Sequence, residues 1–263
     1  MRITYIGHAT VLIEVAGHRI LTDPNFDVAL GRFLPRVSAP GIALDALPKL
    51  DAILLSHAHA DHLSFTSLAA LPSDIPLFAP PKIAQWLATR GWKNATPLPW
   101  GGSVAVGDIT IHAAVARHMG SRYGYDRWRG DASMYLLDTG TVSLFFAGDT
   151  GLTEATHRLV EDRLRPHGRQ LDVALLPIGH APWWKFNFRR GHLTTADAIT
   201  LFERLDAKIF IPYHWGTFDH VTAKAHDAIV RLRAHLPTYA RQHQVRIIEP
   251  GEAFELTAAA GVA

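Results

Sequence analysis

One six-residue segment limits the possible folds of this chain more than any other: His-Ala-His-Ala-Asp-His at positions 57–62. It directly follows Leu50–Ser56, whose run of isoleucine and leucine is typical of a buried strand. Three imidazoles and one carboxylate therefore stand at the end of a strand, separated only by alanine. The alternatives are a solvated histidine-rich turn and a cluster that caps a helix starting near Phe65. The spacing and the apolar strand before it favour a metal site over both.

The chemistry of such a site is narrowed by the absence of cysteine from all 263 residues. Without thiolates, the available ligands are imidazole nitrogen and carboxylate oxygen, which suit Zn²⁺, Mn²⁺ or Fe²⁺. The same absence excludes disulfides and a cysteine nucleophile. The sequence also lacks the G-x-S-x-G elbow of serine hydrolases.

Three more apolar, strand-like runs lead to side chains of the same kind. Residues 144–147 are followed by Asp149, residues 208–212 by His214, and residues 111–117 by His118. Each of these alone is weak evidence, because a single His or Asp after a strand is usually structural. One shared site at the rim of the sheets explains all four strand ends together.

The hydrophobic pattern predicts many short strands with helices between groups of them. The strands are expected at residues 3–6, 11–15, 19–22, 52–56, 109–115, 134–138, 143–147, 173–177, 208–212, 245–248 and 253–256. The helices are expected at residues 65–71, 82–90, 153–162, 195–205 and 223–235, and the fourth has Thr194 or Thr195 as N-cap with Asp197 in its first turn. Residues 23–48 hold four prolines and two glycines, which indicates an ordered loop. This order favours a two-sheet core with helices outside over a regular βαβ repeat, in a single domain over residues 1–263.

The net charge and the hydropathy of the chain limit the kinds of molecule that it is expected to bind. The net charge of +2 comes from 26 basic and 24 acidic residues, which is far from a nucleic-acid-binding composition. No run of about 18 apolar residues is present, so no transmembrane segment is expected. The N-terminus lacks the apolar core of a secretory signal peptide, and a cytoplasmic location is the expectation.

At these residues the chain resembles the metallo-β-lactamase superfamily. Residues 57–62 fit its H-x-H-x-D-H signature, and His118, Asp149 and His214 follow in the expected order. The chain is similar, more narrowly, to the branch with N-acylphosphatidylethanolamine-hydrolysing phospholipase D and ascorbate-6-phosphate lactonase. The segments that carry this similarity are ITYIGHATVLIE at 3–14, LTDP at 21–24, FFAGDTG at 145–151, LLPIG at 175–179 and HWGTF at 214–218. The resemblance implies an α/β fold, the four-layer αββα metallo-β-lactamase sandwich.

The resemblance also implies two divalent metal ions, zinc in the first place, with manganese or iron as alternatives. The implied ligand sets are His57, His59 and His118 for the first ion, and Asp61, His62 and His214 for the second, with Asp149 bridging both. Asp23 matches a strand-end aspartate expected to orient a ligand; an Asx-turn before Pro24 is an equal alternative. His8 is expected to line the site, with a plain turn residue as the alternative.

His192 precedes a predicted helix N-terminus and follows Arg189 and Arg190, a favourable place for a phosphate or oxyanion. It resembles a substrate-side acid or oxyanion donor, which makes Asp61 and His192 the predicted catalytic residues; an ordinary capping-region histidine is the alternative. His180 has no equally clear counterpart in the family.

Two cations that share a water lower its pKa from 15.7 to about 7, and the resulting bridging hydroxide is the expected nucleophile. The leading prediction is a hydrolase of phosphodiester, phospholipid-like substrates, and the alternative is a lactonase or other carboxyl-ester hydrolase. A nuclease and a non-catalytic metal-binding protein are less favoured. The substrate is expected to be a small or lipid-like molecule. Residues 182–190, with Trp183 and Trp184, either grip it or pack into the core, and the arginines of residues 117–129 either bind anions or are solvated.

Overall fold

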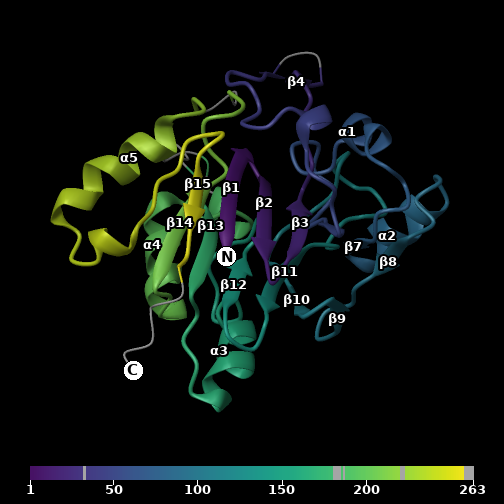
Figure 1. Cartoon of the computed structure of the whole chain (residues 1–263). Coiled ribbons are helices and arrows are strands. Elements are labelled where there is room, and N and C mark those ends of the chain that lie inside the picture. The colour runs from purple at the N-terminus through teal and green to yellow at the C-terminus, as the bar shows by residue number, and fades with distance from the viewer. Residues whose placement is uncertain (32–33, 180–184, 186, 220–222, 258–263) are drawn as a thin grey trace.

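The computed structural model describes residues 1–31, 34–179, 185, 187–219 and 223–257, and its centre is a pair of β-sheets (Figure 1). The first sheet has seven strands in the order β15-β1-β2-β3-β6-β7-β8. These strands are β1 (Arg2–Gly7), β2 (Thr10–Val15), β3 (His18–Thr22), β6 (Ala52–Leu54), β7 (Leu77–Ala79), β8 (Ala95–Pro97) and β15 (Ala253–Glu255). Strands β3, β6, β7 and β8 run parallel, so their carboxyl ends meet at one edge.

The second sheet has six strands in the order β14-β13-β12-β11-β10-β9. Its strands are β9 (Ser103–Val106), β10 (Ile109–Val115), β11 (Ser133–Asp138), β12 (Ser143–Phe146), β13 (Val173–Pro177) and β14 (Ile209–Tyr213). The last three of these are parallel to one another. A separate two-stranded hairpin is formed by β4 (Ala29–Leu30) and β5 (Leu34–Pro35).

Helices cover the outer faces of both sheets. The α-helices are α1 (Phe65–Ala70), α2 (Pro81–Ala88), α3 (Arg158–Leu164), α4 (Thr195–Leu205) and α5 (Asp227–His235). Short 3-10 helices are η1 (Leu44–Ala46), η2 (Arg165–His167), η3 (Phe188–Arg190), η4 (Leu236–Thr238) and η5 (Gln242–Gln244). α2 packs on β7 and β8, while α3 and α4 pack on the second sheet and α5 lies against α4. The order helix, sheet, sheet, helix confirms the predicted four-layer αββα sandwich. In the part of the chain that the structure describes, no helix is long and apolar enough to cross a membrane.

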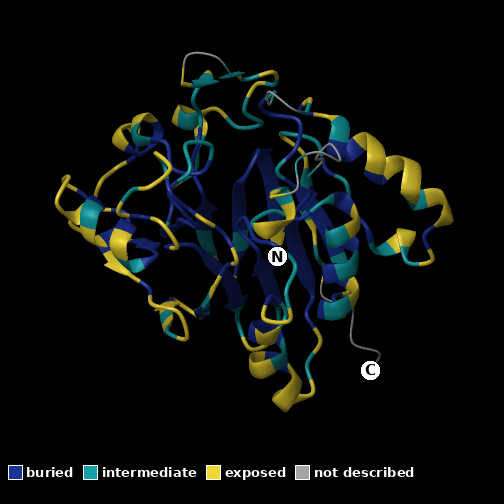
Figure 2. Ribbon diagram, turned by 180° about the vertical axis from the view of Figure 1, so that it is seen from behind, coloured by how far each residue is buried: buried dark blue, intermediate teal, exposed yellow. Residues whose placement is uncertain are grey.

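The alternation of side chains along the strands explains why two sheets can pack together. On β2, Val11 and Ile13 point into the core between the sheets, whereas Leu12 points to the other core, under α1 and α2. β3 divides its side chains in the same way, with Ile20 inside and Leu21 outside. Both faces of the first sheet are therefore apolar, and Figure 2 shows the strands buried while the outer faces of the helices are exposed.

Most predicted elements are present, and the differences have local causes. Residues 245–248 do not form a strand, because only Val245 makes a bridge, to Phe210 of β14. α3 begins at Arg158 rather than at residue 153, since Thr156 hydrogen-bonds back to the Thr153 carbonyl in a turn.

α5 begins at Asp227 rather than at residue 223, because the backbone N–H of Lys224 donates to the Asp227 carboxylate in the turn before the helix. Strands β7, β8 and β9 were not predicted, because runs of three or four residues are too short to show a period. The N-cap of α4 is Thr194, and Asp197 completes a capping box with it. The single-domain organisation stays a prediction.

Candidate metal centre

The two sheets bring five strand ends to one place, called the polar edge below. β3 ends before Asp23, β6 before residues 57–62, β12 before Asp149 and β14 before His214. β10 is antiparallel to β11, which is antiparallel to β12, so β10 points the same way and delivers His118 to the same edge. Parallel strands place their carboxyl ends together, and the structure brings all seven predicted ligands to the polar edge.

One group of side chains at this edge consists of His57, His59, His118 and Asp149, whose candidate ligand atoms all lie within 4.8 Å of one another. His118 Nε2 and His59 Nδ1 lie 2.9 Å apart. Three imidazoles and a carboxylate match the donor set of a mononuclear zinc or manganese site.

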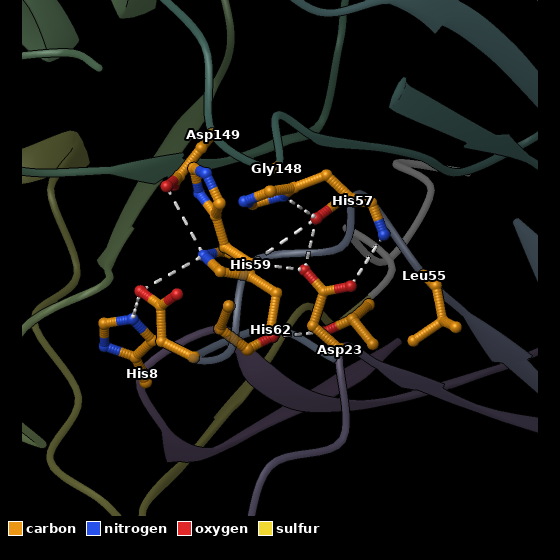
Figure 3. Close-up of polar contacts among 12 residues, drawn as sticks. His8, Asp23, Leu55, His57, His59, His62, Gly148 and Asp149 are labelled. Carbon is orange, nitrogen blue, oxygen red and sulfur yellow. Dashed lines mark hydrogen bonds and ion pairs between the residues drawn. The ribbon is translucent and has the colours of Figure 1, made fainter. Parts of the chain in front are cut away.

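A second group surrounds the other side of Asp149. His62 Nε2 and His214 Nε2 each lie 3.4 Å from Asp149 Oδ2, and 3.8 and 3.6 Å from Asp61 Oδ2. Ligand bonds of 2.0–2.2 Å in a tetrahedron give edges of about 3.4 Å. These distances fit ligands around one cation, and Asp149 belongs to both groups. Figure 3 shows its contact with His62.

The hydrogen bonding of these atoms tests whether a cation fits. Nε2 of His57, His62 and His214 and both carboxylate oxygens of Asp149 are buried, without a hydrogen-bond partner among the described residues. A buried polar atom left unpaired costs about 1–3 kcal/mol, and an unpaired carboxylate costs more. These five atoms point into the two groups, so the side chains present fit two cations.

The far sides of the rings are held by hydrogen bonds that fix their orientation. His62 Nδ1 lies 2.8 Å from Asp23 Oδ2, and Figure 3 shows this ring between Asp23 and Asp149. Asp23 also accepts the backbone N–H of Ser56 at 2.7 Å and its hydroxyl at 2.5 Å. Ser56 Oγ in turn lies 2.9 Å from His57 Nδ1. Asp23 thus has the contacts of a residue that orients a ligand, in addition to its position before Pro24.

Electrostatics divides the imidazoles into two kinds. Burial lowers the pKa of His118 to about 3 and holds that of His57 well below its usual value, so both are neutral. Burial opposes charge on His62 and His214 as well, but Asp149 raises the pKa of His62 well above its usual value and that of His214 to about 9. For Asp149, burial favours the neutral form, yet His214 and His62 hold its pKa well below the usual range. In the metal-free protein, the protons on His62 and His214 supply the positive charge beside Asp149 that bound cations would otherwise supply.

His8 and His192 lie on either side of the centre. His8 Nε2 is 2.8 Å from Asp61 Oδ2. His192 Nε2 is 3.5 Å from Asp149 Oδ2, and its ring stacks on Phe188 at 4.8 Å between centroids. Burial lowers the pKa of His192, so its imidazole is neutral at pH 7.

A cavity of about 520 Å³ lies beside the centre. Its polar lining includes His8, His59, Asp61, His192 and His214. Its apolar lining includes Leu30 and Leu34 of the β4–β5 hairpin, Ile178, Phe188, Trp215 and Phe218. Lys185 and Lys224 also line it. This volume is within the range of small-ligand pockets, about 300–1,000 Å³.

Two loops, residues 182–190 and residues 117–129, are expected as possible substrate contacts, and the structure describes the first only in part. His180, Trp183 and Trp184 lie outside the described residues. In the other loop, Arg122 donates to the carbonyls of Leu63 and Ala58 and lies over the Phe65 ring, which is a structural role. Arg129 lies on the surface over the exposed ring of Tyr125.

Sequence reasoning missed Asn25 and the β4–β5 hairpin. The Asn25 amide donates to the Ala60 carbonyl at 2.9 Å and so holds the 57–62 loop. It stands two residues after Asp23, but no local pattern marks its partner. Leu30 and Leu34 line the cavity although they come from a proline-rich segment without a strand-like period.

Comparison with known proteins identifies the family and agrees with the fold. The model of the family described as "Beta-lactamase superfamily domain" matches residues 18–215. A metal-dependent hydrolase of Geobacillus sp. (strain WCH70) is 31% identical over 259 residues, which are 97% of this chain and 100% of the relative. An N-acyl-phosphatidylethanolamine-hydrolyzing phospholipase D of Caenorhabditis elegans is 29% identical over 82% of this chain.

An uncharacterised protein of Mycobacterium tuberculosis is 30% identical over 83% of the chain. The match spans 59% of the length of the mycobacterial relative and 64% of that of the nematode one. Among solved structures, the isothiocyanate hydrolase from Delia radicum gut bacteria superposes with a TM-score of 0.78. It covers 98% of this chain and 100% of its own at 20% identity, a likeness that concerns the fold.

Proposed function

This chain belongs to the metallo-β-lactamase superfamily of metal-dependent hydrolases, and from this premise we propose that it uses two divalent cations to hydrolyse phosphodiester bonds in small or lipid-like molecules. The observation that carries the two-cation proposal is the position of Asp149. Its carboxylate belongs to the group with His57, His59 and His118, and also to the group with His62, His214 and Asp61. A buried carboxylate whose two oxygens both lack a hydrogen-bond partner among the described residues supports a role between two positive charges.

We assign His57, His59 and His118 to the first cation, Asp61, His62 and His214 to the second, and Asp149 to both. Zinc is the cation we propose, because imidazole and carboxylate in a tetrahedral arrangement suit it; manganese and iron use the same ligands. When bound, such ions supply a water whose pKa is lowered to about 7, and they stabilise negative charge on the substrate.

The chain's own residues orient the reaction. Asp61 faces His62 and His214 with Oδ2, and we assign its other oxygen to accept a hydrogen bond from the attacking water. His192 stands at the cavity wall as a neutral imidazole, which can donate a hydrogen bond to the oxygen that leaves. Stacking on Phe188 holds its ring in place.

The cavity supports a substrate with one polar and one apolar part. A phosphodiester group would lie beside His192 and the metal ligands, and Lys185 adds a positive charge to the lining of the same cavity. Burial lowers the pKa of Lys185, and an anionic ligand beside it would favour its charged form. The apolar lining residues, among them Leu30, Leu34 and Phe218, would contact an alkyl or aryl group. The similarity to a phospholipase D of Caenorhabditis elegans supports the same class.

The test is an assay of zinc- or manganese-loaded protein on bis-aryl phosphodiesters, aryl esters and lactones, with metal content measured in the same samples. We expect turnover of the phosphodiesters and loss of that turnover in Asp61→Ala. Asp45→Ala is the matched control, since Asp45 is exposed in η1. Turnover of esters or lactones alone would replace the phosphodiester proposal, and full activity of Asp61→Ala would refute the site.

A further inference from the structure

His8 is a buried histidine beside the second group of ligands. It stands in the turn between β1 and β2, and its candidate ligand atom lies within 4.8 Å of those of Asp61, His62 and His214. Proximity alone would allow His8 to be a further metal ligand. Its contacts assign it a different role.

The partner of His8 determines which of its nitrogens carries a hydrogen. Nε2 lies 2.8 Å from Asp61 Oδ2, which is a hydrogen-bond distance (Figure 3). As a ligand of the second cation Asp61 would be deprotonated, because a carboxylate binds a metal ion in that form. An ionised carboxylate only accepts hydrogen bonds, so Nε2 of His8 carries the hydrogen and has no lone pair for a metal. Nε2 of His62 and of His214, in contrast, have no hydrogen-bond partner among the described residues.

The oxygen that His8 contacts is the one that faces the second group. Asp61 Oδ2 lies 3.8 Å from His62 Nε2 and 3.6 Å from His214 Nε2. Together with Asp149 Oδ2, these atoms already provide four ligands around one point. His8 therefore completes the hydrogen bonding of a ligand instead of adding a fifth.

His8 is also tied to His214 through its backbone. The His8 carbonyl accepts the His214 N–H at 2.9 Å, and the two rings lie 3.9 Å apart. His8 has a φ of 57°, and His214 has a φ of 69°, so both occupy the left-handed region that non-glycine residues seldom adopt. The backbone hydrogen bond and the ring contact hold both residues in this conformation.

These contacts all involve ligands of one group. We propose that His8 is a positioning residue for the second cation, which donates Nε2–H to Asp61 and holds His214 through its carbonyl, and that it does not support the first cation. The proposal rests on the two-cation function above. It implies that the two sites differ in their dependence on a single side chain, so that one ion can be lost while the other stays bound.

Two substitutions separate a hydrogen-bond donor from an imidazole ligand. In His8→Gln the amide nitrogen stands near the position of Nε2 and can still donate to Asp61. In His8→Asn the amide nitrogen stands near Nδ1, out of reach of Asp61, while asparagine tolerates the left-handed backbone well. His167→Asn is the matched control, because His167 is exposed in η2, remote from the polar edge. The measurement is titration of the metal-free full chain with Zn²⁺ by calorimetry, with bound metal counted by mass spectrometry.

We expect the wild type to bind two ions, and we expect His167→Asn to bind both ions with the same affinities as the wild type. His8→Asn should bind one ion as the wild type does and the other about 10–100-fold more weakly. His8→Gln should recover the weaker site to within a few fold. The proposal is overturned if His8→Asn binds both ions normally, if it weakens both equally, or if His8→Gln is as weak as His8→Asn. A wild type that holds fewer than two ions overturns the two-cation function together with it.

Discussion

Asp23→Asn is the substitution that tests the orientation of His62 most directly. Asp23 is fully buried and accepts three hydrogen bonds, two from Ser56 and one from His62 Nδ1. Asparagine has almost the same shape, but one of its two terminal atoms is a donor. If its oxygen keeps the bond from the Ser56 backbone, its amide nitrogen faces His62 Nδ1.

His62 then has two options, and each weakens the second cation. It can move its hydrogen to Nε2, which removes the lone pair that faces Asp149 and Asp61. It can instead keep Nδ1–H against the amide, which leaves a buried donor unsatisfied. That cost of about 1–3 kcal/mol, at 1.4 kcal/mol per factor of ten, corresponds to roughly 5- to 150-fold weaker binding. The first cation, held by His57, His59 and His118, should keep its affinity within a few fold.

The chain contains a matched control in Asp172. Its Oδ2 accepts the backbone N–H of Ser143 at 2.9 Å and the Ser143 hydroxyl at 3.1 Å, just as Asp23 does with Ser56. Its third partner is Lys208 rather than a histidine, and it lies near the other end of the sheet. Asp172→Asn should therefore lower thermal stability but leave both metal affinities unchanged.

The assay is calorimetric titration of metal-free protein with Zn²⁺, and thermal unfolding of the metal-free forms serves as the measure of folding. Two unchanged affinities in Asp23→Asn would refute the reasoning, because the hydrogen on His62 would then be set by something other than Asp23. Equal weakening by Asp172→Asn would show that the loss reflects general destabilisation.

Three further predictions follow from the same geometry. Removal of metal by a chelator should lower the unfolding temperature, and metal at 100 times its Kd should restore about 2.7 kcal/mol; an unchanged unfolding temperature contradicts the fit of Asp149 to cations. Burial opposes charge on His214, but Asp149 raises its pKa to about 9. Zn²⁺ binding at pH 7.5 should therefore release the proton of His214, and the Zn²⁺ affinity should rise with pH up to about 9. Calorimetry in buffers of different ionisation enthalpy measures the released protons, and binding without proton release refutes this prediction. His192→Phe should lower kcat by about 10²–10⁴-fold with both metals still bound, and a wild-type kcat would remove His192 from the reaction.

The positions of the ligands could be predicted because each follows a strand. A run of apolar residues such as 144–147 is visible in the sequence, and the side chain that follows it is known at once. The rule that carboxyl ends of parallel strands meet then brings Asp149 and His214 together without any coordinates. Strands β7 and β8 could not be found in this way, since three residues show no alternation and they form only by pairing with β6 and with each other.

The residue pattern alone does not separate the roles of the surrounding residues; the expectation that Asp23 orients a ligand comes from the resemblance, with an Asx-turn as an equal alternative. Asp23 and Asp172 each accept two hydrogen bonds from a serine, so these bonds do not distinguish them. Only the third partner does, and it is 39 residues away in the case of His62 and 36 in the case of Lys208. A residue that orients a ligand and one that stabilises a strand end are therefore the same motif with different distant neighbours.

The direction in which the ligands point is set by tertiary contacts as well. Among the described residues, five other than glycine have a positive φ, and three of them are His8, Asp23 and His214. Each such residue costs about 1–3 kcal/mol and persists only where the surroundings hold it. The Asp23 N–H donates to the Leu54 carbonyl and its carbonyl accepts from Thr10, while His8 and His214 hold each other. Glycine is the residue that sequence reasoning expects at such angles, so the side chains that matter most here occupy backbone positions that no sequence pattern would assign to them.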